Sequence, residues 1–224
     1  MTIANYNLLS YDKIPSTQTL ALQMIADGAM SDRTVILAAT QTAGRGRCGR
    51  GWVSQRGNFY ASFAYAMTER RPTISYAFAV AAAETLLSFG IPATIKWPND
   101  ILADGKKLAG MLLEYCRGFL VVGVGINIRS CPTVEKYATT KTDAYAKGLT
   151  PDALLEGLIR NFDKWRRASF ATIRARWMEL SIDLNSPITY RGKPALYCGL
   201  NECGAMIMLR GDRYELVYGD EIFT

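Results

Sequence analysis

The chain has 224 residues, of which 49% are hydrophobic and 21% charged, and its formal net charge is +6. It contains no histidine, which excludes Ser-His-Asp and Cys-His catalysis and any histidine-ligated metal. The five cysteines form no CxxC pair, which disfavours a disulfide framework and a thiolate zinc site and favours free thiols in a reducing compartment.

The first half of the chain is expected to combine strands with two helices. The expected elements are a strand over 5–15, a helix over 16–28, a buried strand over 33–41, a strand over 58–65 and an alanine-rich helix over 73–90. Ser16 or Thr17 is the expected N-cap of the first helix, and Gly28 and Gly90 follow the two helix ends. The second helix is the most apolar segment, but it is too short to span a bilayer and carries Glu84. Because a signal-peptide pattern is also missing, we expect a cytoplasmic protein without a membrane segment.

The second half is expected to begin with strands and to end in a separate small module. The expected elements are strands over 93–97, 107–116 and 119–128, an irregular connection over 129–149, helices over 151–167 and 170–181, and four short strands from Ser186 onward. Thr150-Pro151-Asp152 supplies a cap, a first-turn proline and an acidic residue to the first of these helices. Strands and helices do not alternate strictly, which predicts an α+β fold with a mixed sheet flanked by helices. The last strands are too short for a large core, so we expect a small barrel-like domain over 184–224 after a main domain over 1–183.

The segment TAGRGRCGRGW, residues 42–52, alternates four glycines with three arginines. Gly44, Gly46 and Gly49 match the dinucleotide-binding fingerprint, but the residues that follow predict strand and turn where that fingerprint requires a helix. A P-loop also fails, because Arg50-Gly51 stand where lysine and a hydroxyl residue are required. Taken alone, the loop is equally compatible with a solvated arginine-rich segment that contacts nucleic-acid phosphates. The net positive charge favours an anionic partner in either case.

A second cationic segment follows at IKWPNDILADGKKLAGMLLE, residues 95–114. Lys96 and Lys107 flank a turn at Asn99-Asp100, where short polar side chains can face a ligand. Each lysine alone would be interpreted as exposed at a strand end, and the turn as ordinary turn chemistry. Two lysines beside such a turn, in a chain with an arginine loop, predict a convergent phosphate site.

Two glycines also interrupt the strand VVGVGIN, residues 121–127. Glycines inside a strand indicate either the close approach of another group or packing against a helix. Asn127 at the end of this strand can read a purine edge, although alone it says little.

Taken together and in this order, GRGRCGRGW, KWPNDIL, KLAGMLLE and VVGVGINI closely resemble the biotin protein ligases, and PSTQ resembles the family's STN at the start of the first helix. The resemblance covers essentially the whole chain. It implies a class II synthetase-like catalytic domain followed by an SH3-like C-terminal domain. It also implies an ATP-dependent biotin–acetyl-CoA-carboxylase ligase. Such an enzyme forms biotinyl-5′-AMP and pyrophosphate and then transfers biotin to a lysine of a biotin carboxyl carrier domain.

The resemblance assigns site residues position by position. The biotin-binding residues that it implies are Ser16, Thr17, Gln18, Gln41, Gly44, Arg45, Gly46, Arg47, Lys107 and Gly110. The ATP-binding residues that it implies are Arg47, Arg50, Trp52, Lys96, Asn99 and Asn127. Lys107, Arg47 and Lys96 are the implied catalytic cations. The protein itself would ligate no metal and hold no prosthetic group, since Mg²⁺ arrives with ATP.

Three features depart from the family pattern. Gln18 stands where the family has asparagine, and Cys48 stands in the loop where a bulkier or basic residue is usual. The chain also begins at the catalytic domain, so we expect neither a helix-turn-helix nor sequence-specific DNA binding. A homodimer is possible, while the acceptor carboxylase, the oligomeric state and the order of substrate binding are left open.

Two other functions compete with biotin ligation. A lipoate or octanoate ligase or transferase would share the fold, but those families lack the paired GRGRxGR and KWPND motifs. A basic nucleic-acid-binding module belongs to a different class, and it would show a salt-dependent gel shift without pyrophosphate release.

Overall fold

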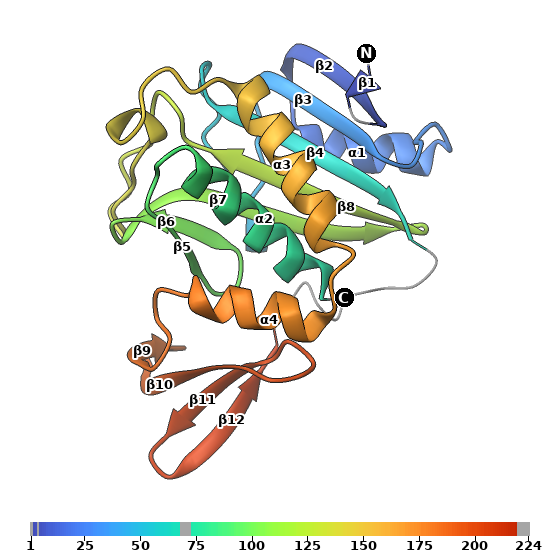
Figure 1. The fold of residues 1–224 in the computed structure, drawn as a ribbon. Helices are drawn as coiled ribbons and strands as arrows, with labels where there is room; N and C mark the ends of the chain where they lie inside the picture. The colour runs from blue at the N-terminus through green and yellow to red at the C-terminus, as the bar shows by residue number, and fades with distance from the viewer. Residues whose placement is uncertain (1, 4, 68–72, 219–224) are drawn as a thin grey trace.

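The structure is a computed structural model that describes residues 2–3, 5–67 and 73–218. Its main part is an eight-stranded sheet with helices on both faces, and a smaller sheet follows (Figure 1). The elements of the main part are β1 (Thr2–Ile3), β2 (Tyr6–Ile14), α1 (Thr17–Ala26), β3 (Thr34–Gln41), η1 (Arg47–Gly49), β4 (Phe59–Ala66), α2 (Ile74–Ser88), β5 (Ala93–Lys96), β6 (Asp100–Ala103), β7 (Lys106–Cys116), β8 (Phe119–Ile126), η2 (Thr142–Ala144), α3 (Pro151–Trp165) and α4 (Phe170–Glu179).

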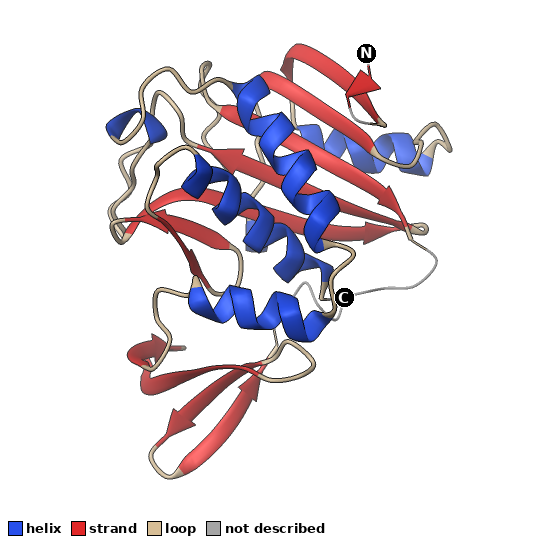
Figure 2. Ribbon diagram, viewed as in Figure 1, coloured by secondary structure: helices blue, strands red, loops and turns tan. Residues whose placement is uncertain are grey.

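The large sheet is mixed, as expected. Its strand order is β1-β2-β3-β4-β8-β7-β6-β5. The β2–β3 pair is parallel and the other neighbouring pairs are antiparallel. The parallel pair follows from α1, since a crossover helix lets two consecutive strands run in the same direction. The predicted α+β class with helices flanking a mixed sheet is therefore confirmed (Figure 2).

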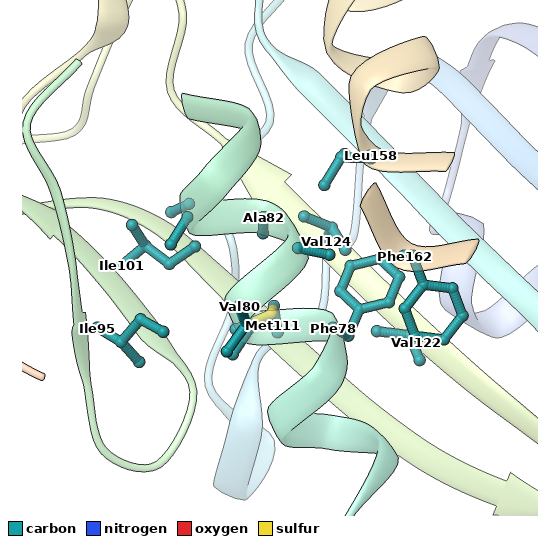
Figure 3. Packing of buried hydrophobic residues seen from close by; sticks show 14 of the residues in the cluster. Phe78, Val80, Ala82, Ile95, Ile101, Met111, Val122, Val124, Leu158 and Phe162 are labelled. Carbon is teal, nitrogen blue, oxygen red and sulfur yellow. The ribbon is translucent and has the colours of Figure 1, made fainter. Parts of the chain in front are cut away.

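Alternating side chains of β4 divide the interior into two cores. Phe59, Ala61 and Phe63 face α2 and α3 in the larger core, whereas Ala64 belongs to a smaller core against α1. Helix α2 is buried around most of its circumference because it packs on the sheet with α3 on one side and α4 on the other (Figure 1). Its alanines allow this close packing. Figure 3 shows the larger core, in which the labelled residues are Phe78, Val80, Ala82, Ile95, Ile101, Met111, Val122, Val124, Leu158 and Phe162.

Local capping signals are confirmed at two helix starts. Ser16 Oγ accepts a hydrogen bond from Thr19 N at 3.3 Å, and Thr150 Oγ1 accepts one from Ala153 N at 3.3 Å. Each hydroxyl satisfies a backbone donor that the first helical turn leaves without a partner. The cap at Ser16 places the first turn of α1 directly against the end of β3, which positions one wall of the site described below.

Two strands were not predicted. The sequence predicts strands over 93–97 and 107–116 and a turn at Asn99-Asp100 between them, but Asp100–Ala103 forms β6, which pairs with β5 and β7. A four-residue strand is too short to show an alternating pattern, so only the turn signal was detected. The two-residue strand β1 also pairs with β2 and was missed for the same reason.

The C-terminal part contains the four expected short strands. They are β9 (Ser186–Tyr190), β10 (Lys193–Leu200), β11 (Met206–Arg210) and β12 (Arg213–Val217). They form an antiparallel sheet in the order β12-β11-β10-β9. Within the described residues β9 and β12 do not pair, so the sheet is open and the expected closed barrel is not seen. The boundary at 183/184 stays a prediction.

Candidate active site

The main candidate site lies on the face of the sheet that α1 covers. Its walls are the start of α1, the end of β3 and the arginine loop, and its floor is formed by β7 and β8. Twenty residues line it: Ser16, Thr17, Gln18, Gln41, Arg45, Gly46, Arg47, Arg50, Gly51, Trp52, Asn99, Asp100, Lys107, Gly110, Met111, Leu112, Gly123, Val124, Gly125 and Tyr137. The arginine loop and the KWPND–KLAG segment therefore converge on one pocket, as the sequence predicts.

The arginine loop is an ordered hairpin in this structure. Arg45 and Gly51 form an antiparallel bridge, Gly46 N donates to Arg50 O at 2.7 Å, and Trp52 N donates to Gly44 O at 2.8 Å. At the tip Cys48 adopts a left-handed conformation with φ = 53° and is exposed to solvent. The hairpin thus directs Arg45, Arg47 and Trp52 toward the sheet. Glycine is required at position 44, where the two sides of the hairpin meet, because an added Cβ would lie 2.5 Å from Trp52 O.

Trp52 lies directly on the glycines of the floor. A Cβ added to Gly125 would overlap the indole atoms Nε1 and Cε2, and one added to Gly110 would lie 3.0 Å from Cζ3. These glycines therefore allow close approach of an aromatic ring, which decides between the two interpretations of VVGVGIN. Trp52 Nε1 has no hydrogen-bond partner within the described part of the chain.

The remaining cavity is about 90 Å³, whereas small-molecule sites usually enclose about 300–1,000 Å³. The hairpin and Trp52 therefore occupy much of the pocket in this conformation, and a ligand of ordinary size requires the loop or Trp52 to shift.

Lys107 projects from the start of β7 into the pocket. Its backbone is fixed by the connection over 129–149, since Lys107 N donates to Ala138 O and Thr140 N donates to Lys107 O, both at 2.9 Å. Its ammonium Nζ lies 2.8 Å from Asp100 Oδ1, and only 17% of the side chain is exposed. The same Nζ lies 5.6 Å from the ring centroid of Trp52 and 5.4 Å from that of Tyr137. Both are cation–π distances, so the ammonium is held by one carboxylate and two aromatic rings.

Arg47 is held by the turn that follows KWP. Its Nη1 donates to Asn99 Oδ1 at 3.1 Å, and Asn99 Nδ2 donates to the carbonyl of Met111. Asn99 is 9% exposed. The amide therefore connects the sheet to the loop guanidinium, and it places a second cation beside Lys107 in the same pocket.

A chain of polar side chains continues from Arg45 around the base of α1. Arg45 Nη2 forms an ion pair with Glu114 Oε1 at 2.8 Å, and Gln18 Nε2 donates to Glu114 Oε2 at 2.9 Å. On the other side, Thr17 N donates to Gln41 Oε1 at 2.8 Å. Gln18 thus belongs to the site and contacts Glu114. An asparagine, which the family usually has at this position, is one methylene shorter and would not reach as far.

Three of the predicted site residues lie outside the pocket lining. Gly44 is in the loop, where an added Cβ would lie 2.5 Å from Trp52 O. Lys96 is half exposed, its Nζ lies 4.0 Å from Asp183 Oδ2, and it lines a different cavity beside β9. Asn127 is 2% exposed and donates from Nδ2 to Thr140 O at 3.0 Å. Its Oδ1 has no hydrogen-bond partner among the described residues. Neither Lys96 nor Asn127 thus lines the pocket, although Asn127 N donates to Leu108 O beside Lys107 and Lys96 pairs with Asp100 in the sheet.

Asp100, Glu114 and Tyr137 were not predicted as site residues. Asp100 was noted only as a turn residue, and Glu114 only as the last residue of a quoted motif. Tyr137 lies in the irregular connection, where no periodic pattern exists. One signal could have found Glu114, because an acidic residue inside an apolar strand requires a partner when it is partly buried.

Within residues 2–3, 5–67 and 73–218, no group of three or more metal-ligating side chains is present. Across the same ranges, no helix is long and apolar enough to span a membrane. The five cysteines, all within the described ranges, are free thiols.

Comparison with known proteins gives consistent similarities. A model of the biotin/lipoate A/B protein ligase family matches residues 11–129. A biotin–acetyl-CoA-carboxylase ligase of Paracoccus denitrificans is 32% identical over 238 residues, which cover 93% of this chain and 96% of the relative. The bifunctional ligase/repressor BirA of Bacillus subtilis is 26% identical, with 98% of this chain and 74% of the relative covered. Among solved structures, the biotin protein ligase of Aquifex aeolicus in complex with biotin and ATP superposes with a TM-score of 0.81 at 27% identity and covers 96% of this chain and 97% of that chain.

Proposed function

Since the chain belongs to the biotin/lipoate A/B protein ligase family, we propose that it is an ATP-dependent biotin protein ligase that forms biotinyl-5′-AMP and transfers biotin to a carrier lysine. One observation carries this proposal. The arginine loop and the KLAG lysine meet in a single pocket over a floor of glycines, so Arg47 and Lys107 present two positive charges to one site. The choice of biotin is supported by the full-length similarity to a named biotin ligase.

In the first half-reaction, a biotin carboxylate oxygen attacks the α-phosphorus of ATP. A C–O–P bond forms, the bond from the α-phosphorus to the bridging oxygen breaks, and pyrophosphate leaves. The two reacting groups are both anions, so the barrier contains their mutual repulsion. Lys107 and Arg47 lower it by presenting fixed positive charge to the carboxylate and the α-phosphate, and no proton acceptor is required. This chemistry is compatible with a chain that lacks histidine.

The polar end of the pocket suits the ureido ring of biotin. Ser16, Thr17 and Gln41 supply hydroxyl and amide groups that can both donate and accept hydrogen bonds. Gly46 and Gly110 leave room for the ligand's apolar part, and Arg45 stands beside them. Gly44 contributes indirectly, since it lets the loop backbone cross Trp52.

The other end of the pocket is assigned to ATP. Arg47, Arg50 and Asn99 face the phosphates, and Trp52 covers the base. Lys96 and Asn127 lie beyond the closed pocket, and we assign them to the nucleotide once the loop has opened to admit it. The buried Oδ1 of Asn127, which has no partner among the described residues, is a suitable acceptor for an adenine amino group.

Magnesium is assigned as part of the ATP substrate. Asp100 is the one carboxylate among the residues that line the described pocket, and it already pairs with Lys107. A single carboxylate suits Mg²⁺ that arrives with phosphate and water ligands, because this ion binds proteins through few carboxylates.

In the second half-reaction, a lysine amine of a biotin carboxyl carrier domain attacks the carbonyl of the mixed anhydride. The lysine attacks as the neutral amine; as the amide forms, the C–O bond to AMP breaks, AMP leaves with the bonding electrons, and the proton from the amine passes to solvent. Before this step the closed hairpin excludes water from the anhydride, which would otherwise hydrolyse. The carrier domain is thus the proposed protein partner. The free thiols support a cytoplasmic location, where they stay reduced.

Pyrophosphate release tests the proposal. The purified chain is mixed with ATP and Mg²⁺ and with biotin, lipoate or octanoate in separate reactions. Pyrophosphate release with biotin but not with lipoate or octanoate supports the proposal. Release with lipoate or octanoate but not with biotin refutes the choice of substrate. Incorporation of labelled biotin into a carrier domain then tests the second half-reaction. A carrier variant with the acceptor lysine changed to arginine is the control.

A further inference from the structure

Glu114 ends a continuous hydrogen-bond network beneath the pocket. Its two carboxylate oxygens have different partners, since Oε1 binds Arg45 Nη2 at 2.8 Å and Oε2 accepts from Gln18 Nε2 at 2.9 Å. Behind Gln18, Ser62 Oγ lies 3.0 Å from Gln18 Oε1 and 2.9 Å from Thr17 Oγ1. The network thus connects a loop arginine to the first turn of α1 through one carboxylate.

Donor and acceptor chemistry fixes the direction of this network. An ionised carboxylate only accepts, so Gln18 must present its Nε2 to Glu114 and its Oε1 to Ser62. Thr17 Oγ1 lies 3.2 Å from Gln41 Oε1, and Gln41 Nε2 donates to Ser54 Oγ at 2.8 Å. Ser54 Oγ in turn donates to the Trp52 carbonyl at 3.0 Å. Both ends of the arginine loop are therefore tied to the same set of side chains.

The surrounding backbone leaves room for the network. A Cβ added to Gly123 would lie 2.6 Å from Gln18 Oε1, so this position must be glycine for Gln18 to take its place. Gln18 is 3% exposed and Ser62 is 0% exposed. Buried amides and hydroxyls are retained at low cost only when their partners are present. The glycine in VVGVGIN that is nearest α1 thus serves the network, whereas Gly125 serves Trp52.

The Arg45–Glu114 pair itself contributes little to folding stability. The two side chains are 38% and 28% exposed, and solvent screens such pairs. Its effect is positional. An arginine has five N–H donors in a rigid plane, so a carboxylate that holds Nη2 orients the other donors toward the pocket. Ordering the guanidinium before the ligand binds reduces the entropy that binding must overcome.

From this geometry we infer that Glu114 is a positioning residue for biotin binding: it holds Arg45 over the pocket and keeps the arginine loop closed, with Gln18 as the side chain that orients it. The inference rests on the proposed function and names a residue that acts through Arg45 without contacting the substrate. Gln18 lines the pocket itself and orients the Glu114 carboxylate from the first turn of α1. Its extra methylene, relative to asparagine, is what lets it reach Glu114.

The test separates binding of biotin from binding of ATP. In the full chain, Glu114→Ala should raise the KM for biotin by about tenfold, because loss of a hydrogen bond to a charged group has this order of effect. The KM for ATP should change by less than about twofold, a change too small to indicate a lost contact. Glu114→Gln keeps an acceptor for Arg45 and should recover part of the biotin affinity. Gln18→Ala should raise the KM for biotin in the same direction and should add little to Glu114→Ala in the double variant.

Hydrogen exchange provides a readout that does not need catalysis. The amides of Gly46 and Trp52 close the hairpin, so both should exchange faster in Glu114→Ala than in the unmodified chain. Glu84→Gln is the matched control. Glu84 is a 17%-exposed carboxylate that pairs with Lys164 and Arg176 away from the pocket. This control should lower thermal stability while the KM for biotin and the loop exchange rates stay unchanged.

The outcomes separate the positioning role of Glu114 from the proposed biotin ligase function. If Glu114→Ala is folded and neither the KM for biotin nor the exchange of Gly46 and Trp52 changes, the positioning role is refuted. A fall in kcat with an unchanged KM for biotin refutes it as well, because a direct catalytic role would then be indicated. Should Glu114→Ala fail to fold, Glu114→Gln alone decides through the same two readouts. If the unmodified chain releases no pyrophosphate in response to biotin, the proposed function is refuted. The exchange rates of Gly46 and Trp52 still test whether Glu114 holds the arginine loop.

Discussion

Replacing Lys107 by alanine tests the electrostatic account of the first half-reaction. The variant removes the ammonium that lies 2.8 Å from Asp100 Oδ1 and projects into the pocket. It leaves the strand intact, because Lys107 is tied to residues 138–140 through backbone groups that alanine also has. We therefore expect a folded protein with an altered site.

The magnitude follows from the charges. At about 4 Å and an effective dielectric of about 20, a cation and an anion attract by about 4 kcal/mol, which corresponds to about 10³ in rate if the contact is complete only in the transition state. Removal of a single fixed donor typically lowers kcat by about 10²–10³. Both routes predict a loss of biotin-dependent pyrophosphate release of about two to three orders of magnitude. Loss of the lysine also leaves Asp100 facing the incoming anions, which adds to the effect.

The assay is single-turnover formation of the adenylate with biotin and ATP. The double variant Lys107→Ala/Asp100→Asn separates the two contributions, because it removes the lysine without leaving an isolated carboxylate. If the double variant regains most of the activity, Lys107 serves only to neutralise Asp100, and its catalytic role is wrong. The reasoning is also refuted if Lys107→Ala retains more than about a tenth of the rate, since no lost donor of the expected strength would fit so small an effect.

Three further predictions concern other parts of the molecule. Gly125→Ala should displace Trp52, whose indole the new Cβ would overlap, and should weaken substrate binding by at least about tenfold in calorimetric titration. Burial opposes ionisation of Glu84, but hydrogen bonds from Trp165, Lys164 and Arg176 prevail and lower its pKa below the usual 4.5. A carboxylate with a lowered pKa stabilises the folded state above its unfolded pKa, and this stabilisation is lost as pH falls through the folded pKa. Urea unfolding should therefore show a loss of stability below about pH 4.5 that is smaller in Glu84→Gln. Cys48 and Cys203 are the exposed thiols among the five cysteines, so iodoacetamide labelling with peptide mapping should find these two modified first.

The sequence predicted the elements whose signals are local. Ser16, one of two candidate caps beside Thr17, and Thr150 were identified because a hydroxyl before an apolar helix commonly caps it, and both accept the expected hydrogen bonds. The convergence of the arginine loop with Lys107 and Asn99 was also predicted, because the motifs carry charges that need a shared anion. The charges and hydrogen-bonding groups of these residue types were therefore sufficient to predict that they meet in one site.

What the sequence did not predict depends on contacts between distant segments. Glu114 meets Arg45 across 69 positions, and Lys107 meets the ring of Tyr137 from an irregular connection. No period or spacing encodes such pairs, since they follow from the order β4-β8-β7-β6 in the sheet. Lys96 was grouped with the site because it is close in sequence to Asn99. The turn between β5 and β6 instead directs it toward Asp183.

The arrangement links catalysis to loop closure in one step. Arg45, Arg47 and Trp52 belong to the same hairpin, so the cations proposed to orient biotin and to face the phosphates, and the ring proposed to exclude water, move with one segment. Lys107 lies on the sheet and forms an ion pair with Asp100. In the proposed mechanism, an open loop would leave the sheet lysines Lys96 and Lys107 in place but would withdraw the arginines Arg45, Arg47 and Arg50. Only the closed loop would supply these arginines and the dry environment in which the charges act strongly. Under the proposed function, formation of the reactive anhydride would thereby be confined to the conformation that protects it.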